Sequence, residues 1–495
     1  MKSAKKIVAA LLCAAFLVPF AMPYAAAKGA KACDCGEVVQ IFVDGFGQPL
    51  YYNEGTPEEK RAELIVTDNL LPTIPGVLLG LARSLLGGGA VPFAQGLAGL
   101  MAALMENLLL DPEGRSVAPI GSHWKINPDQ DHKTSPQYDF RYDFRLDPFT
   151  IAAQLNEFIE ALCAQTGHVK VALTGHSEGA VVAMTYLAQY GCKRLDTLIL
   201  NNGGWQGLSM AGQLFSGDFG LSGAAVTNYI ADLDDGTLLL KAGMNVLRAS
   251  GLLDFIAPAL TRFIVENLMD ELFEYVLMPL FCTMPVIWSF IPGENYDAAI
   301  EWISGGPTYD TLRAKAERYH CEVYLKAESL LKSAKKAGVK VAVVAAYGPA
   351  PIPVTADAMY QSDSLIDTAL MSGGATAAPI GQTLPPGNSK YRSPDGILDA
   401  ATCMLPDNTW FIKYNVHDAG PARELRQWII HAKDPDVWSN PDFPQYLQRT
   451  EDGKAVPLGQ EKAGRPLPQD FTGALEDFLW IAAGQILLAV YEQGR

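Results

Sequence analysis

Short, uninterrupted apolar runs alternate along much of the chain with segments whose apolar residues recur every three or four positions. The first pattern is typical of buried strands and the second of helices packed on one face. The apolar runs predict strands at 38–43, around 138–144, and at 169–173, 197–200, 339–348 and 409–415. Helices are predicted from Asp147-Pro148 onward, at 180–189 and at about 421–431. This alternation predicts an α/β fold with a mostly parallel central sheet and helices on both of its faces.

The alternation stops between about 205 and 337, where long helical patterns take over. We therefore expect a core in two halves, 28–204 and 338–432, that builds one sheet around a helical cap, or lid, inserted at 205–337. Residues 433–495 are predicted to be a Pro- and Asp-rich extension that ends in an amphipathic helix near 475–491. The apolar segment 56–111 is interrupted by Arg83 and Glu106, which favours amphipathic helices over a membrane span.

The N-terminus has the pattern of a secretory signal. Lys2, Lys5 and Lys6 precede the apolar run IVAALLCAAFLVPF, and small residues follow before Lys28. An uncleaved membrane anchor is the alternative, but Pro19 and Pro23 shorten the apolar run. We expect residues 1–27 to be a cleaved signal peptide and the mature protein to be secreted or extracytoplasmic.

The net charge of the chain excludes some classes of binding partner. The chain has 495 residues and a formal net charge of −16, and loss of the three signal-peptide lysines would make it more acidic still. Such a charge argues against nucleic acid and anionic membrane surfaces as partners.

The seven cysteines outside the signal are scattered and odd in number, so they predict no disulfide framework, although export permits one or two bridges. Because Cys33-x-Cys35 has no second Cys/His pair at ligand spacing, no metal site is expected.

One serine stands where an apolar strand turns directly into a helix. It is Ser177, in Gly175-His176-Ser177-Glu178-Gly179. A tight strand–serine–helix turn crowds the backbone, so it needs small residues on either side, and the helix N-terminus supplies amide donors. This context predicts that Ser177 is a nucleophile.

A nucleophilic serine needs a base, and the base needs an acid that orients it. In the strand–turn–helix arrangement the chain order is Ser, acid, His. His417 follows a strand directly and is the favoured base, whereas His320 lies in a charged helical stretch and His431 at a helix end. The acid is expected after the strand 339–348. The candidates are Asp357, Asp363 and Asp367, with Asp363 favoured and Asp367 the runner-up, either of which could instead cap a helix.

Two backbone amides are expected to stabilise an oxyanion. They are those of Glu178, directly after the serine, and of Phe46, in the glycine-rich turn Asp44–Gly47 after the first strand. A Glu178 carboxylate beside an oxyanion would be unfavourable unless its side chain points away, into solvent or toward a partner, and the sequence does not assign it a role.

Together these motifs resemble the α/β-hydrolase superfamily, in particular lipases and lecithin:cholesterol acyltransferase-like enzymes. The segments VDGFG, YDFRLDP, GHSEG, SDSLIDTA and NVHDAG carry the resemblance, which spans most of residues 37–432. The chain departs from the family pattern at Ser364, where glycine is usual. The resemblance implies hydrolysis of acyl esters through an acyl-enzyme, with Ser177, Asp363 and His417 as catalytic residues and no metal or organic cofactor.

The amount of apolar helical surface around 75–110 and 252–292 predicts a lipid-like or other hydrophobic ester as substrate, with lipid-interface contact through the cap. The leading hypothesis is a secreted lipase or carboxylesterase. An acyltransferase or phospholipase of the same fold, a non-catalytic envelope-associated binding protein, and a protease are the alternatives. Ordinary helix–helix packing would explain any single apolar stripe equally well.

Overall fold

A computed structural model describes residues 33–233, 257–258, 261–262, 265–266, 269–355, 358–420 and 422–459. Three features expected from the sequence lie outside these residues: the signal peptide 1–27, the helix near 475–491 and the candidate acid Asp357.

In the described part of the chain, eight strands form one sheet in the order β13-β12-β11-β8-β7-β6-β1-β5. The strands are β1 (Gln40–Val43), β5 (Gln137–Phe140), β6 (Val171–His176), β7 (Leu195–Asn201), β8 (Lys340–Tyr347), β11 (Thr409–Lys413), β12 (Tyr446–Arg449) and β13 (Ala455–Pro457). All neighbouring pairs are parallel except β12–β13. The predicted α/β fold with a mostly parallel sheet is therefore confirmed, and strands from both outer parts of the chain share that sheet.

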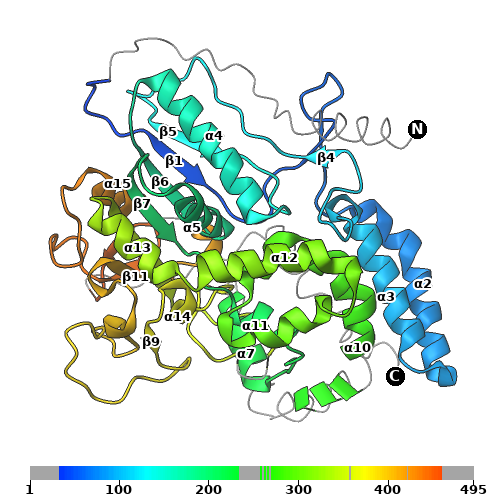
Figure 1. Ribbon diagram of the computed structural model, residues 1–495. Helices are drawn as coiled ribbons and strands as arrows, with labels where there is room; N and C mark the ends of the chain where they lie inside the picture. The colour runs from blue at the N-terminus through cyan, green and yellow to red at the C-terminus, as the bar shows by residue number, and fades with distance from the viewer. Residues whose placement is uncertain are drawn as a thin grey trace.

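Helices cover both faces of this sheet, because successive strand residues point to opposite sides. In β6, Val171 and Leu173 belong to the core formed with α4 (Pro148–Thr166) and α5 (Glu178–Tyr190). Between them, Ala172 belongs to a second core with Leu425 and Ile429 of α15 (Arg423–His431). Figure 1 shows α4 and α5 running together over the strands. This two-faced burial explains why the strands read as continuous apolar runs.

The start of α4 follows from its sequence. The Asp147 carboxylate accepts a hydrogen bond from the Thr150 amide, and Pro148 occupies the first turn, where no amide donor is needed. Gly167 ends the helix in the left-handed region, with φ 76°. The helix predicted from Asp147-Pro148 is confirmed.

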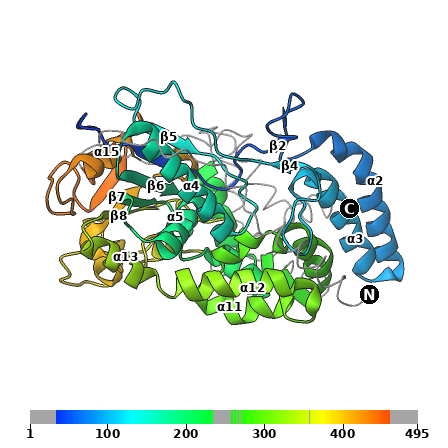
Figure 2. The ribbon, with the colours of Figure 1, turned by 45° about the horizontal axis from the view of Figure 1, so that its top comes forward.

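The described residues between β7 and β8 are helical and include no strand, as the loss of alternation predicts. They include α6 (Ser209–Phe215), α7 (Gly223–Leu233), α10 (Met269–Leu272), a π-helical segment (Phe273–Cys282), a 3-10 segment (Pro285–Phe290), α11 (Gly293–Ile300), α12 (Asp310–Tyr319) and α13 (Ala327–Lys336). Figure 2 shows α11 and α12 side by side. Near the end of the region, α13 packs on β8 and α5 and so returns the chain to the sheet.

A helical hairpin precedes β5 and is formed by α2 (Leu70–Arg83) and α3 (Val91–Leu104). The two helices approach closely at a glycine: a Cβ on Gly80 would lie 2.2 Å from the carbonyl oxygen of Pro92. Buried residues line α3, whereas α2 and the π-helical segment Ser84–Gly88 that follows it leave Leu71, Leu85 and Leu86 exposed by 77%, 79% and 88%. Figures 1 and 2 place the hairpin at the opposite end of the molecule from α15.

Within the described residues, one helical segment, Thr67–Gly88, is long and apolar enough by length and composition to cross a membrane, and 11% of its most apolar window is buried. The sequence favours an amphipathic helix here, and Arg83 does lie in the last turn of α2.

Two expectations were wrong in detail. Strand β5 ends at Phe140 rather than near 144, because residues 141–146 leave the sheet and turn toward α4. The segment after 433 is not merely an irregular extension, since β12 pairs with β11 and β13 completes the sheet edge. These strands have only four and three residues, too few for a period of two to be recognised in the sequence.

A buried ion pair lies in the segment between β5 and α4, and it also binds the part of the chain that follows the hairpin. The Arg145 guanidinium is fully buried and binds both carboxylate oxygens of Asp143, at 2.9 and 2.7 Å. It also donates to the carbonyl oxygens of Asn107 and Ile120. All of these contacts are made inside the protein, where an unpaired charge is strongly unfavourable.

Replacing Arg145 with methionine is expected to lower the free energy of unfolding by about 3–5 kcal/mol, because Asp143 is left as an uncompensated buried carboxylate. Urea unfolding would measure the change. The matched control is Arg194→Met, which breaks the exposed pair with Glu160 and should change the free energy by at most about 1 kcal/mol. Equal effects of the two substitutions would show that the buried pair does not stabilise the fold.

Candidate active site

Four segments that carry predicted site residues meet at the carboxyl ends of the parallel strands. Because β1, β6, β8 and β11 are parallel, their carboxyl ends lie on the same side. Ser177 follows β6 directly, and His417 lies four residues after β11. The loop after β8 carries Asp363, and the turn after β1 carries Phe46.

Ser177 has a strained backbone that only its surroundings can hold. Its φ is 55° and its ψ is −122°, outside the regions that an L-residue favours. A Cβ on Gly175 would lie 2.3 Å from the carbonyl oxygen of Gly179, and a Cβ on Gly179 would lie 1.9 Å from that of Val43. Both glycines are therefore required for the turn that presents the serine, as the sequence indicates.

The structure brings Ser177, His417 and Asp363 into one hydrogen-bonded chain, which we call the Ser–His–Asp chain. Ser177 Oγ lies 2.9 Å from His417 Nε2, and His417 Nδ1 lies 2.7 Å from Asp363 Oδ2. All three residues are buried, with 7% of Ser177, 7% of His417 and none of Asp363 exposed. An imidazole held between a carboxylate and a hydroxyl can accept the hydroxyl proton while the carboxylate stabilises the resulting cation.

A tight turn fixes the direction of the Asp363 carboxylate. Asp363 Oδ1 accepts hydrogen bonds from the amides of Leu365 and Ile366, at 3.0 and 2.7 Å, so that Oδ2 faces His417. The amide of His417 in turn donates to the Asp363 carbonyl oxygen at 2.8 Å. Ser364 adopts φ 90°, a conformation that explains why glycine would be favoured at this position.

Asp367, the other described candidate acid, has a different partner. Its Oδ2 accepts a hydrogen bond from the amide of Ser209, at 2.7 Å, at the start of α6. Burial raises the Asp367 pKa to about 6. Asp367 therefore binds the first turn of α6. Helix capping is the alternative role that the sequence allows for this residue.

The two other candidate histidines have different surroundings. His320 stacks on Tyr296, with ring centroids 3.7 Å apart, and His431 is exposed in the last turn of α15.

A further histidine, His176, contributes to the site and was not predicted. Its ring centroid lies 5.2 Å from that of His417, and its Nδ1 lies 3.2 Å from the carbonyl oxygen of Asn201. Burial, with a smaller effect of His417, lowers the His176 pKa to about 4. His176 is therefore neutral at neutral pH and adds no charge beside His417. Its position directly before Ser177, at the end of β6, is the sequence signal that could have identified it.

The turn after β1 lies directly against the serine. A Cβ on Gly45 would lie 2.5 Å from Ser177 Cβ and 3.6 Å from the amide nitrogen of Glu178. The Tyr142 hydroxyl donates to the Asp44 carbonyl oxygen at 2.7 Å and so supports this turn. Phe46, the predicted second amide donor, packs against Phe144 with ring centroids 4.4 Å apart.

The Glu178 side chain does not point into solvent, contrary to one of the two expectations for it. It is fully buried, and its carboxyl group interacts with the side chain of Tyr142. Burial raises the Glu178 pKa well above its usual range, and the nearby carboxylates of Asp143 and Asp44 raise it further. This shift favours the protonated, uncharged form of Glu178, which lessens the electrostatic conflict with an oxyanion.

This burial predicts a pH-dependent effect of Glu178→Gln. In the wild type, the folded state keeps a proton that the unfolded state releases near pH 4.5, so stability falls as pH rises toward the folded-state pKa. The slope approaches about 1.4 kcal/mol per pH unit. Because glutamine does not titrate, the stability of Glu178→Gln relative to wild type should increase with pH above about 5.

Urea unfolding of both proteins between pH 4 and 8 would measure this difference. Glu58→Gln, at an exposed glutamate, is the matched control and should show no such trend. A constant difference between Glu178→Gln and wild type across this range would show that Glu178 is ionised in the folded protein.

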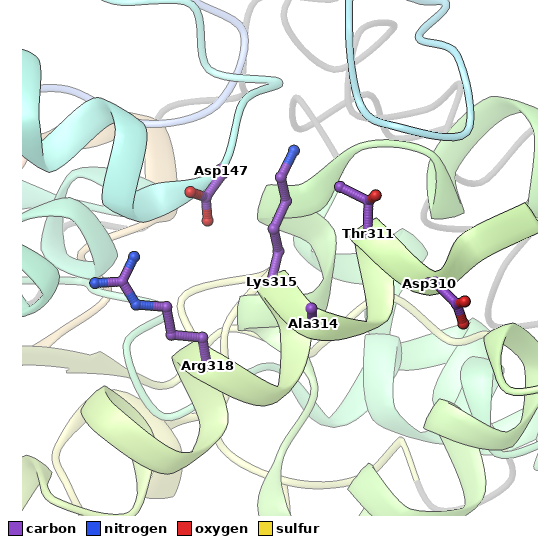
Figure 3. A pocket seen from close by; sticks show the side chains of 6 residues that line it. All are labelled: Asp147, Asp310, Thr311, Ala314, Lys315 and Arg318. Atoms are coloured by element: carbon purple, nitrogen blue, oxygen red, sulfur yellow. The ribbon is translucent and has the colours of Figure 1, made fainter. Parts of the chain in front are cut away.

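A surface hollow of about 470 Å³ lies between the start of α4 and α12 (Figure 3). It is lined by Asp147, Asp310, Thr311, Ala314, Lys315 and Arg318. None of these residues belongs to the Ser–His–Asp chain. Both cations have partners, since Lys315 donates to the Glu113 carbonyl oxygen and the Arg318 guanidinium lies 3.6 Å from the centre of the Phe149 ring.

Metal-ligating residues gather around Cys33 and Cys35, where the sequence predicts no metal site. Cys33 and Cys35 lie beside His132 and His168, and the four ligand atoms are all within 4.8 Å of one another. The argument from spacing against a metal site therefore fails, because the histidines come from distant parts of the chain. The seven cysteines of the described residues are all free, so none of the permitted disulfide bridges is present there.

No protein-family model matches the chain, and searches of curated proteins and of solved structures find no significant match.

Proposed function

We propose that this chain is a serine hydrolase that cleaves acyl esters of hydrophobic substrates, in the manner of a lipase or carboxylesterase. The observation that carries the proposal is the Ser–His–Asp chain, with contacts of 2.9 and 2.7 Å, attached to a strained serine turn at the carboxyl edge of a parallel sheet. A serine held in such a conformation requires two specific glycines, which ordinary packing would not demand.

In the proposed reaction, His417 Nε2 takes the proton of Ser177 Oγ while this oxygen attacks the ester carbonyl carbon. The resulting imidazolium is stabilised by Asp363 and gives its proton to the departing alkoxide, which leaves as an alcohol. Water, deprotonated by His417, then attacks the acyl-enzyme, and release of the carboxylic acid restores the Ser177 hydroxyl.

The oxyanion of each tetrahedral intermediate would be bound by the backbone amides of Glu178 and Phe46. The Glu178 amide begins α5, where the helix dipole favours negative charge. The closeness of Gly45 to Ser177 supports Phe46 as the second donor, because it brings the adjacent backbone beside the reacting oxygen. One such donor typically contributes about 3 kcal/mol of transition-state stabilisation.

A hydrophobic acyl substrate is supported by the exposed leucines of the α2–α3 hairpin. Leu71, Leu78 and Leu79 of α2 are exposed by 77%, 54% and 51%. Exposed apolar surface of this kind is typical of proteins that contact lipid or other apolar partners. We assign the hairpin and the helices between β7 and β8 to a cap on an α/β-hydrolase core, in a protein exported by its N-terminal signal.

The proposal is tested by labelling the folded protein with a fluorophosphonate probe and by measuring turnover of p-nitrophenyl esters of increasing acyl length. We expect stoichiometric labelling of Ser177, located by peptide mass spectrometry, and turnover that favours longer acyl chains. Folded protein that neither reacts with the probe nor hydrolyses any ester, with or without lipid micelles, would overturn the proposal.

A further inference from the structure

Two cysteines and two histidines meet on the side of the fold where the described chain begins. Cys33 and Cys35 precede β1, His132 lies in the loop before β5, and His168 lies between α4 and β6. The amide of Cys33 donates to the Gly167 carbonyl oxygen at 3.0 Å, which places the cysteine segment beside the loop of His168.

The separations of the ligand atoms fit a single tetrahedral ion. Cys33 Sγ lies 3.3 Å from His132 Nε2, and Cys35 Sγ lies 3.5 Å from His168 Nε2. Around zinc, with bonds of about 2.3 Å to sulfur and about 2.0–2.1 Å to nitrogen, tetrahedral sulfur and nitrogen ligands lie about 3.5–3.6 Å apart. The two observed pairs therefore lie at nearly the separation that a shared ion would impose.

The chemistry of the four groups also suits zinc. Two thiolates and two neutral imidazoles are a common set for structural zinc, and their charge balances that of the ion. Without an ion, the four side chains would be held together by weak thiol–imidazole hydrogen bonds and by the edge-to-face contact of the two imidazole rings, whose centroids lie 5.0 Å apart.

We propose that Cys33, Cys35, His132 and His168 bind one structural zinc ion. Four protein ligands leave no open position for substrate, so the ion stabilises the fold and takes no part in chemistry. It would fasten the segment before β1 to the loops beside β5 and β6. This inference does not depend on the proposed hydrolase activity.

The site joins parts of the chain that are far apart in sequence. Cys33 and His132 are 99 residues apart, and Cys35 and His168 are 133 residues apart. Closing such long loops restricts the unfolded chain strongly, so zinc is expected to raise the midpoint of thermal unfolding.

The test begins with metal analysis of protein purified without added metal or chelator, followed by cobalt titration of the chelator-treated, reduced protein. We expect about one zinc ion per chain, and cobalt spectra with thiolate charge-transfer bands and the intense visible bands of tetrahedral coordination. Chelation should lower the midpoint of thermal unfolding, and added zinc should restore it.

Matched variants assign the ligands. Cys35→Ser and His168→Gln should bind cobalt at least about 10-fold more weakly than wild type. Cys321→Ser, at an exposed free cysteine, and His123→Gln, at an exposed histidine, should bind it as wild type does. The cobalt titration of wild-type protein needs no variant to fold, so it is decisive by itself.

Absence of thiolate charge-transfer bands in the reduced wild-type protein would overturn the proposal. A Cys33–Cys35 disulfide in protein purified without reductant, together with no bound zinc, would also overturn it. Equal cobalt affinity of Cys35→Ser and Cys321→Ser would assign the metal to another place.

Discussion

Replacing Ser177 with alanine is expected to lower kcat for ester hydrolysis by about 10⁶-fold and to abolish fluorophosphonate labelling. In the proposed reaction the Ser177 hydroxyl, which contacts His417 Nε2, supplies the attacking oxygen, so its loss leaves no nucleophile and no proton for the base to accept. The measurement is turnover of a p-nitrophenyl ester by wild type and variant, prepared in parallel.

The Ser177→Ala substitution should also change the stability of the fold little, because only a hydroxyl group is lost and the backbone stays in place. The midpoint of thermal unfolding should therefore remain close to that of wild type. The control is Ser329→Ala, at an exposed serine of α13, which should retain full activity. Turnover by Ser177→Ala within about 10-fold of wild type would mean that another group is the nucleophile.

The second large effect is expected from Asp363→Asn, which should lower kcat by about 10⁴-fold. Asp363 Oδ2 accepts the His417 Nδ1 proton, and this contact keeps the lone pair of Nε2 directed at Ser177. An asparagine amide at this position would donate to Nδ1 and favour the wrong tautomer. Because labelling by the probe also needs the base, its rate should fall in parallel with kcat.

Asp367→Asn is the matched control for Asp363→Asn, because the two carboxyl groups are close in sequence and both are buried. Asp367 accepts from the Ser209 amide rather than from His417, so its replacement should alter thermal stability with little change in kcat. Comparison of kcat and unfolding midpoints for the two variants separates catalysis from folding. Loss of kcat in Asp367→Asn but not in Asp363→Asn would exchange their assigned roles.

Much of the sheet was predictable because its strands are buried on both faces. Such strands read as continuous apolar runs, and the runs at 169–173 and 339–348 correspond to β6 and β8. Short strands carry a weaker signal, and β12 and the edge strand β13, with four and three residues, escaped prediction. The start of α4 was predictable for a local reason, since its cap and proline are adjacent in sequence.

The candidate site was predictable where local geometry demands particular residues. Gly175 and Gly179 mark the serine turn because any side chain there would collide with backbone, and strand ends mark His417 and Asp363. The preference for Asp363 over Asp367 rested on pattern alone in the sequence. The structure distinguishes their contacts: one carboxylate faces His417, and the other faces the start of α6.

The sequence by itself determined the alternation of strands and helices, the serine turn and the order of the candidate Ser, Asp and His, because each depends on neighbouring residues. Only the tertiary structure decided that Glu178 is buried and that His176 lies beside His417. It alone also joined Cys33 and Cys35 to His132 and His168. These features depend on contacts between segments that are distant along the chain, and no local spacing records such contacts.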